Sequence, residues 1–113
     1  MKPFRTRQNK PQADYIVRVD VAAKRKMEGH ARFLARVSVP AAQILRNAYI
    51  SALKSLETNP QRCPLYIPNV DIEAELRYLL FTQRYRIVFE IVDTTVYVYD
   101  VQDVRQNEDK NLV

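Results

Sequence analysis

Several residue types are scarce in this chain, and each scarcity excludes a class of structure. One glycine among 113 residues leaves few positions free to rely on positive φ, and it excludes a glycine-rich phosphate loop. The single cysteine, Cys63, cannot form an internal disulfide, which suits a reducing cytoplasm. No apolar run approaches the roughly 20 residues of a membrane span, and no apolar stretch follows the basic N-terminal residues as in a secretory signal. We therefore expect a cytoplasmic protein without a membrane segment.

Motifs of the common catalytic and metal sites are missing as well. The sequence contains no zinc-binding pattern, nucleophile elbow or paired-carboxylate motif. His30, the only histidine, lies beside Gly29 and far along the chain from the arginine-rich segments, which favours a packing or surface role. Cys63 has no metal-binding partner nearby in the sequence and is expected to be structural. The sequence therefore predicts no cofactor and no metal site.

The net charge of +5 is concentrated at one end of the chain. Residues 1–12 carry four basic residues and no acidic one, whereas the remainder carries 14 basic and 13 acidic residues. We predict a single domain over residues 14–106, a basic N-terminal arm over 1–13 and a tail over 107–113. The arm could attract phosphates or could be a solvated tail.

The first half of the chain predicts a strand followed by two helices. Residues 15–20 alternate and are rich in β-forming residues, and Asp20 suits the N-cap of a helix over 21–37. Ser38 and Pro40 predict the start of a second helix that runs to about residue 58. So short a link between two amphipathic helices indicates an antiparallel helical hairpin.

The first predicted helix carries two features beyond its apolar face. Gly29 weakens the middle of this helix by up to about 1 kcal/mol relative to alanine. The run Lys24-Arg25-Lys26 is typical of a solvated helix face, but it could also contact nucleic acid or an acidic partner.

The second half of the chain predicts a β-sheet. An irregular proline-containing connection over 59–71 precedes three β-rich runs over 73–81, 84–92 and 95–104. The order is β-α-α-β-β-β, which predicts an α+β fold with an antiparallel sheet packed against an α-hairpin. The first strand must join this sheet at a distance, because the helices separate it from the others.

Hairpin register assigns the strand residues to two faces, because side chains alternate along a strand. With two-residue loops at 82–83 and 93–94, Leu79 is expected to pair with Arg86 and Val88 with Tyr99. The face expected to lie under the helices then collects Leu76, Tyr78, Leu80, Tyr85, Ile87, Phe89, Ile91, Val96 and Val98. The opposite face collects Arg77, Leu79, Phe81, Arg84, Arg86, Val88, Glu90, Tyr97, Tyr99, Asp103 and Arg105.

Arginines interleaved with tyrosines on the second face suit a nucleic acid. Guanidinium groups can hold a phosphate backbone, and tyrosine rings can stack on bases. The structural alternative is a set of cross-strand ion pairs, Arg77–Glu90 and Arg84–Asp103. Both interpretations stay open at this stage.

The strand pattern resembles the RelE/ParE toxins of type II toxin–antitoxin systems. The resemblance rests on LRYLLF over 76–81, RYRIVFEI over 84–91, VYVY over 96–99 and the basic Arg105, together with the order of elements over residues 14–107. It implies a toxin that a cognate antitoxin neutralises in a toxin–antitoxin hetero-oligomer, with no membrane partner. RelE-like members cleave mRNA on the ribosome, whereas ParE-like members inhibit DNA gyrase and are not nucleases.

A ribosome-dependent mRNA endonuclease is the slightly preferred function, and it would need no metal. The resemblance places Arg86 at the transition-state arginine and Arg105 near a second basic position. Attack of a 2′-hydroxyl on phosphate also requires a base and an acid, for which Glu90 and Tyr97 are the candidates. RNA-binding roles are expected for Arg77, Arg84 and Tyr99.

Two other functions stay open. The end of the chain, residues 106–113, is acidic and lacks the basic and aromatic tail that follows in RelE-like nucleases. This departure favours a ParE-like gyrase inhibitor, and a decayed toxin that only binds its antitoxin is the third alternative.

Overall fold

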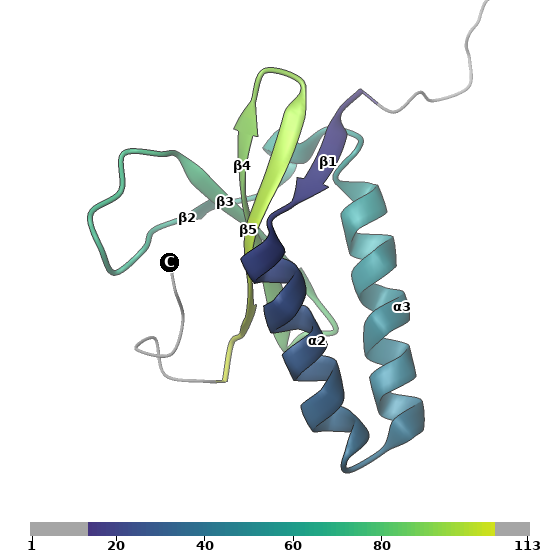
Figure 1. The fold of residues 1–113 in the computed structure, drawn as a ribbon. Helices are drawn as coiled ribbons and strands as arrows, with labels where there is room; N and C mark the ends of the chain where they lie inside the picture. Colours follow the sequence, from purple (N-terminus) through teal and green to yellow (C-terminus); the bar gives the residue numbers. More distant parts are fainter. Residues whose placement is uncertain (1–13, 106–113) are drawn as a thin grey trace, which may run out of the picture.

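A hairpin of two helices packs against a five-stranded sheet in the computed structural model, which describes residues 14–105 (Figure 1). The elements are β1 (Ile16–Val19), α2 (Val21–Ala35), α3 (Val39–Ser55), the 3-10 helix η1 (Pro60–Arg62), β2 (Leu65–Tyr66), β3 (Leu76–Phe81), β4 (Tyr85–Val92) and β5 (Thr95–Asp103). None of the helices in this range is long and apolar enough to cross a membrane. The predicted arm over 1–13 and the tail over 107–113 lie outside the described residues.

Both helices begin where their capping residues predict. The Asp20 carboxylate accepts a hydrogen bond from the Ala22 amide at 3.0 Å, and the Ser38 hydroxyl accepts one from the Ala41 amide at 3.1 Å. These contacts satisfy amides that have no partner within the helix, and Pro40 stands in the first turn of α3. The helices end two to three residues earlier than the pattern suggested, at Ala35 and Ser55.

The strands form one mixed sheet in the order β1-β5-β4-β3-β2. β1 pairs in parallel with β5, and the other neighbours are antiparallel. The predicted α+β fold is confirmed, including the first strand that joins at a distance. The sheet is mixed rather than antiparallel, because the chain crosses over through α2 and α3 before it returns. The short β2 lies within the segment that was expected to be irregular.

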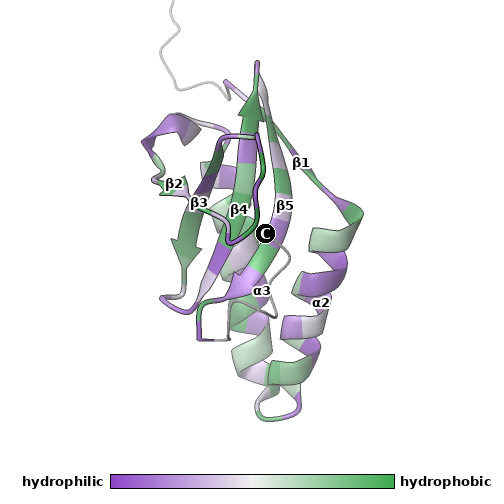
Figure 2. Cartoon of the chain, turned by 90° about the vertical axis from the view of Figure 1, so that its left-hand side faces the viewer, coloured by the Kyte–Doolittle hydropathy of each residue, from purple (hydrophilic) through white to green (hydrophobic). Residues whose placement is uncertain are grey.

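The main core lies between the helices and one face of the sheet. Phe89, Ile87 and Val98 are fully buried there, and alanines on α2 and α3 let the helices approach closely. Figure 2 shows hydrophobic stretches along the strands, in green, interrupted by polar positions, in purple. We call this side of the sheet the helix face.

The β3–β4 loop is one residue longer than expected, and this changes the register. Phe81 pairs with Tyr85 and Leu79 with Ile87, so the loop contains three residues, 82–84, rather than two. Thr82 and Gln83 both have positive φ, at 52° and 61°. The predicted pairing of Leu79 with Arg86 is therefore wrong, and every side chain of β3 points to the face opposite to the one expected.

A β-bulge in β5 shifts the second hairpin as well. Val92 pairs with Thr95 as predicted, but Phe89 pairs with Val98 and Val88 with Asp100, so Tyr99 is an extra residue. The predicted pairing of Val88 with Tyr99 is therefore wrong. A bulge places two residues opposite one and reverses the alternation beyond it. Asp103 is thus moved to the helix face.

The two faces of β3 are consequently exchanged. Leu79 and Phe81 pack in the main core, and Arg77 shares their side of the strand. Leu76 and Tyr78 lie on the other side, in a small second core with Val88. We call this second side the loop face, since the segment between β2 and β3 lies over it.

Candidate functional site

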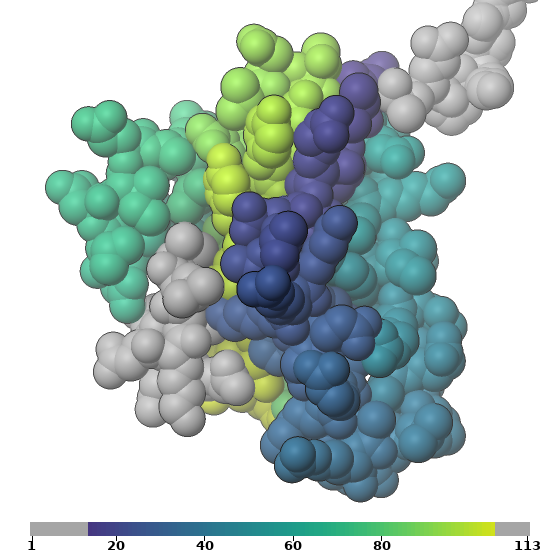
Figure 3. Space-filling view, viewed as in Figure 1, coloured from purple at the N-terminus to yellow at the C-terminus, as the bar shows by residue number. Residues whose placement is uncertain are grey.

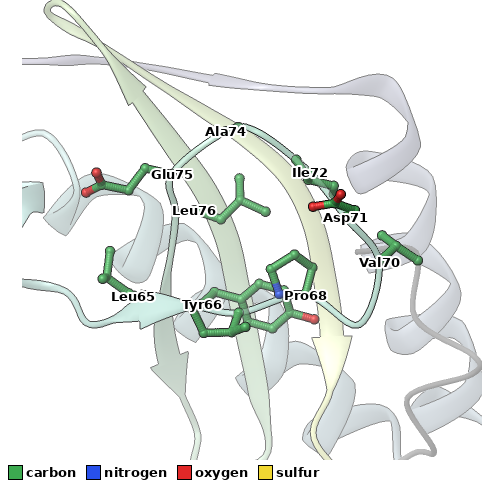
Figure 4. Close-up of a pocket in the computed structure, with 10 residues that line it drawn as sticks. Leu65, Tyr66, Pro68, Val70, Asp71, Ile72, Ala74, Glu75 and Leu76 are labelled. Atoms are coloured by element: carbon green, nitrogen blue, oxygen red, sulfur yellow. The ribbon is translucent and has the colours of Figure 1, made fainter.

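The loop face is partly covered by the chain itself. Ala74, from the segment that joins β2 to β3, packs against a cluster of Tyr66, Leu76 and Val88. Figures 2 and 4 show this segment passing in front of the strands, on the side away from α3. The segment also lines a hollow of about 280 Å³ beside Tyr66 and Leu76 (Figure 4). The face on which we expected nucleic acid is therefore not a bare sheet.

Arg86, near the start of β4, lies on the loop face between two aromatic rings. Its guanidinium carbon lies 4.9 Å from the ring centre of Tyr66 and 5.8 Å from that of Tyr78. Its Nε donates a hydrogen bond to the side-chain oxygen of Gln102 at 2.6 Å. Cation–π contacts and this hydrogen bond fix the arginine in one orientation.

A chain of buried polar groups continues from Arg86 to α2. The Gln102 amide nitrogen donates to the Tyr66 hydroxyl at 3.1 Å and to the Asp100 carboxylate at 2.9 Å. Lys26 approaches Asp100 to 2.8 Å from α2, at a stretch of β5 that β1 does not cover. Asp100 and Gln102 are fully buried, so these contacts compensate the loss of water.

The carboxylate predicted as a base is already engaged. Glu90 accepts a hydrogen bond from the Tyr99 hydroxyl at 2.8 Å. Burial, followed by this hydrogen bond and the negative charge of Glu90, raises the pKa of Tyr99 to about 12. Tyr97 stands opposite Glu90 in the register and opposite Arg18 of β1, so all four side chains share the loop face.

Arg77 lies away from this cluster. Its guanidinium donates to the carbonyl oxygens of Cys63 at 2.7 Å and Gln61 at 3.3 Å, and it pairs with Glu75 at 2.9 Å. Arg77 does not form the predicted ion pair with Glu90 within residues 14–105, because the two side chains lie on opposite faces of the sheet. Arg77 thus tethers the segment before β2 to the sheet.

Arg84, in the β3–β4 loop, and Arg105, just after β5, both contact Asp103. Both Nε and Nη2 of Arg84 donate to Asp103, at 3.2 and 3.1 Å, which confirms the predicted ion pair. The amide of Arg105 donates to the same carboxylate at 3.0 Å, while its side chain is 65 % exposed. Burial raises the pKa of Asp103, but the hydrogen bonds from Arg84 and Arg105 and their charges outweigh it, so the pKa is lowered.

The structure therefore separates the predicted site residues into three groups. One group lies on the loop face: Arg86, Glu90, Tyr97 and Tyr99. Arg84 and Arg105 converge on Asp103, and Arg77 serves the β2 segment. On the loop face the cations of Arg18, Arg86 and Lys26 face the carboxylates of Glu90 and Asp100, so the charge is almost balanced.

Sequence reasoning missed several members of the loop-face cluster. Tyr66 was missed because it lies in a strand of only two residues. Tyr78 was missed because the predicted register of β3 placed it on the other face of the sheet. Arg18 is visible in the alternation of the first strand, but its neighbours depend on the parallel pairing with β5. A signal for the bulge exists, since the apolar spacing changes from two to three residues between Val98 and Val101.

His30 and Cys63 both have structural roles in the fold. The His30 Nε2 donates a hydrogen bond to the Val101 carbonyl at 2.8 Å. Cys63 is buried in the main core, and burial raises the pKa of its thiol in spite of nearby Arg62 and Arg77. Within residues 14–105, no group of three histidine, cysteine or acidic side chains is arranged to hold a metal ion.

Comparisons with known proteins give a consistent picture. A family model described as "ParE toxin of type II toxin-antitoxin system, parDE" matches residues 17–108. A solved chain from the chromosomal ParDE TA system of P. aeruginosa superimposes with a TM-score of 0.64 at 8 % sequence identity, covering 81 % of this chain and 98 % of that one. At that identity the likeness concerns the fold alone. No curated protein sequence matches the chain.

Proposed function

The chain belongs to the ParE toxin family of type II toxin–antitoxin systems, and from this premise we propose that it acts by binding its target rather than by cleaving RNA. The observation that carries the proposal is the separation of the predicted arginines. Arg86 has no second predicted arginine beside it, since Arg77 and Arg84 are engaged elsewhere. A phosphorane carries extra negative charge, and an arginine that is already hydrogen-bonded to Gln102 and in contact with the rings of Tyr66 and Tyr78 is poorly suited to stabilise it.

The acid–base chemistry of a nuclease lacks support for a similar reason. Glu90, the candidate base, already accepts a hydrogen bond from the Tyr99 hydroxyl, and the raised pKa of Tyr99 keeps this phenol protonated and donating. A general base must be free to accept the proton that it abstracts. The roles of Arg86, Arg105, Glu90 and Tyr97 in catalysis stay predictions.

For the target, we propose DNA gyrase, as the ParE-like branch of the resemblance implies. For the partner, we propose an antitoxin encoded beside the toxin gene, which neutralises the chain by covering its surface. The chain would then be toxic when it is made alone and harmless when the two are made together.

The test combines an RNA readout with a gyrase readout. After a short pulse of expression, we expect growth arrest with intact cellular mRNA in primer extension, and the purified chain should inhibit supercoiling by gyrase in vitro. Co-expression of the adjacent reading frame should restore growth. Arg86→Ala and the more conservative Arg86→Lys, each checked by circular dichroism, should leave the mRNA pattern unchanged.

Two outcomes would overturn this proposal. Cuts within codons that disappear in a folded Arg86→Ala variant would establish the nuclease. Normal growth together with uninhibited gyrase would instead indicate a decayed toxin that only binds its antitoxin.

A further inference from the structure

The single glycine of the chain, Gly29, lies in the middle of α2, at a position where neither the backbone conformation nor the packing requires glycine. Gly29 does not have positive φ, and a Cβ added there would meet no atom within 4 Å apart from its chain neighbours and the backbone of its own helix. A glycine inside a helix costs about 1 kcal/mol relative to alanine. The missing side chain therefore serves neither a turn nor the packing of the described residues.

Two hollows meet at Gly29. One, of about 390 Å³, lies between α2, the start of β4 and the end of β5. It includes His30 and Tyr85, whose ring centres are 5.1 Å apart. The other, of about 140 Å³, lies on the outer side of the helix. Phe33 borders both and is 60 % exposed, so an apolar ring is presented to solvent beside an open stretch of helix backbone. Figure 3 shows the α2 surface, in blue, from outside.

The rim of these hollows is cationic. Arg32 and Arg36 line the outer hollow, and Arg25 lies one turn before Gly29 on the same stripe of the helix. Neither Arg25 nor Arg36 forms an ion pair with another described residue. The nearest acid on α2, Glu28, is held by both nitrogens of Arg46, at 2.6 and 3.3 Å. At the inner hollow, the carboxylate of Asp103 is neutralised by Arg84.

We propose that this surface, Gly29 with Phe33 and the cations Arg25, Arg32 and Arg36, docks an acidic segment of the antitoxin. This inference rests on the proposed function. An apolar side chain of the partner would enter the hollow beside Phe33 and approach the backbone at Gly29. Flanking carboxylates of the partner would pair with the arginines. A protein segment fits better than a nucleic acid, because Gly29 and the exposed ring of Phe33 line both hollows and offer an apolar side chain a place to pack between the charged groups.

The glycine gives the proposal an unusual test, because stability and binding should change in opposite directions. Gly29→Ala and Gly29→Leu should raise the thermal midpoint of the chain, since both residues favour helix and the space is open. Gly29→Leu should fill the site and weaken binding of the adjacent gene product about tenfold or more. Ser51→Leu, which adds similar bulk to an exposed position of α3, should bind as wild type does.

The charged rim is tested separately. The double variant Arg32→Glu/Arg36→Glu should weaken binding at low salt, with a smaller loss at high salt, because screening removes part of the repulsion. Lys54→Glu in the last turn of α3 is the matched control. Affinities are measured by calorimetry with the purified product of the adjacent reading frame, and a short duplex DNA is titrated in parallel.

The outcomes separate this inference from the proposed function. Wild-type affinity in the Gly29→Leu and double-arginine variants would overturn the inference and leave the toxin–antitoxin pair intact. Loss of DNA binding alone would assign the surface to nucleic acid and would also overturn it. If the wild-type chain itself fails to bind the adjacent product, the proposed partner falls, and this docking site falls with it.

Discussion

The two faces of the sheet are stabilised by different interactions. On the helix face, apolar side chains such as Phe89 and Ile87 are completely buried against the helices. On the loop face, a small apolar cluster around Val88 lies beside a chain of polar groups from Arg86 to Lys26. Dispersion and hydrophobic burial need only volume and shape, whereas buried polar groups need specific partners. Charges that look available in the sequence are for this reason largely engaged within the fold.

The largest expected effect on the free energy of unfolding comes from removing a large buried side chain from the helix face. Phe89→Ala removes a fully buried ring and should lower the free energy of unfolding by about 3–5 kcal/mol. Leu80→Ala, at a position of the loop face that is 48 % exposed, should cost less than about 1 kcal/mol. Urea denaturation of the two variants gives both values. Equal losses would contradict the contrast between the two faces.

A smaller effect on the free energy of unfolding is expected when the network of polar side chains from Arg86 to Lys26 is interrupted. Lys26→Met leaves the carboxylate of Asp100 buried without its cation and should cost about 3 kcal/mol. Lys24→Met changes an exposed residue of the same helix and should stay within about 0.5 kcal/mol of wild type. The same denaturation experiment measures both, and a neutral Lys26→Met would show that the pair contributes little.

The smallest expected effect concerns the pKa of one residue of the loop face, Tyr99. Because the folded pKa of Tyr99 is raised to about 12, its contribution to stability is complete below the ordinary tyrosine pKa of about 10 and is lost as the pH rises through 12. Glu90→Gln removes a hydrogen-bonded negative charge and should lower the pKa of Tyr99 without returning it fully, since burial is the larger cause.

Spectrophotometric titration of tyrosinate measures this pKa. The Tyr99→Phe variant identifies which part of the absorbance change belongs to Tyr99. An unchanged titration curve in Glu90→Gln would show that the pair does not form in solution.

Much of the architecture was accessible from local signals. Asp20 and Ser38 predicted both helix starts, because a capping side chain acts on amides two or three residues away. The order of elements and the assignment to the RelE/ParE superfamily were predicted as well, and both are confirmed. One ion pair across the sheet, Arg84–Asp103, was also predicted from the sequence, and it forms in the structure.

The candidate site was predicted less well, since it depends on register. Leu76, Tyr78 and Leu80 alternate with Leu79 and Phe81, so β3 is apolar on both faces and its pattern does not say which face is inside. One extra loop residue then reverses the whole strand. The loop-face cluster also needs Tyr66 and Lys26, which lie far from Arg86 in the chain.

The sequence by itself determined both helices, the four longer strands, their order and the family, because caps, periodicity and strand patterns act over a few residues. Only the tertiary structure decided which arginines meet. The three-residue turn at 82–84 and the bulge at Tyr99 set the faces, and contacts across the sheet fixed Arg86, Asp100 and Lys26 in one network. The physical reason is that a strand offers two equivalent faces, and packing against the rest of the molecule selects between them.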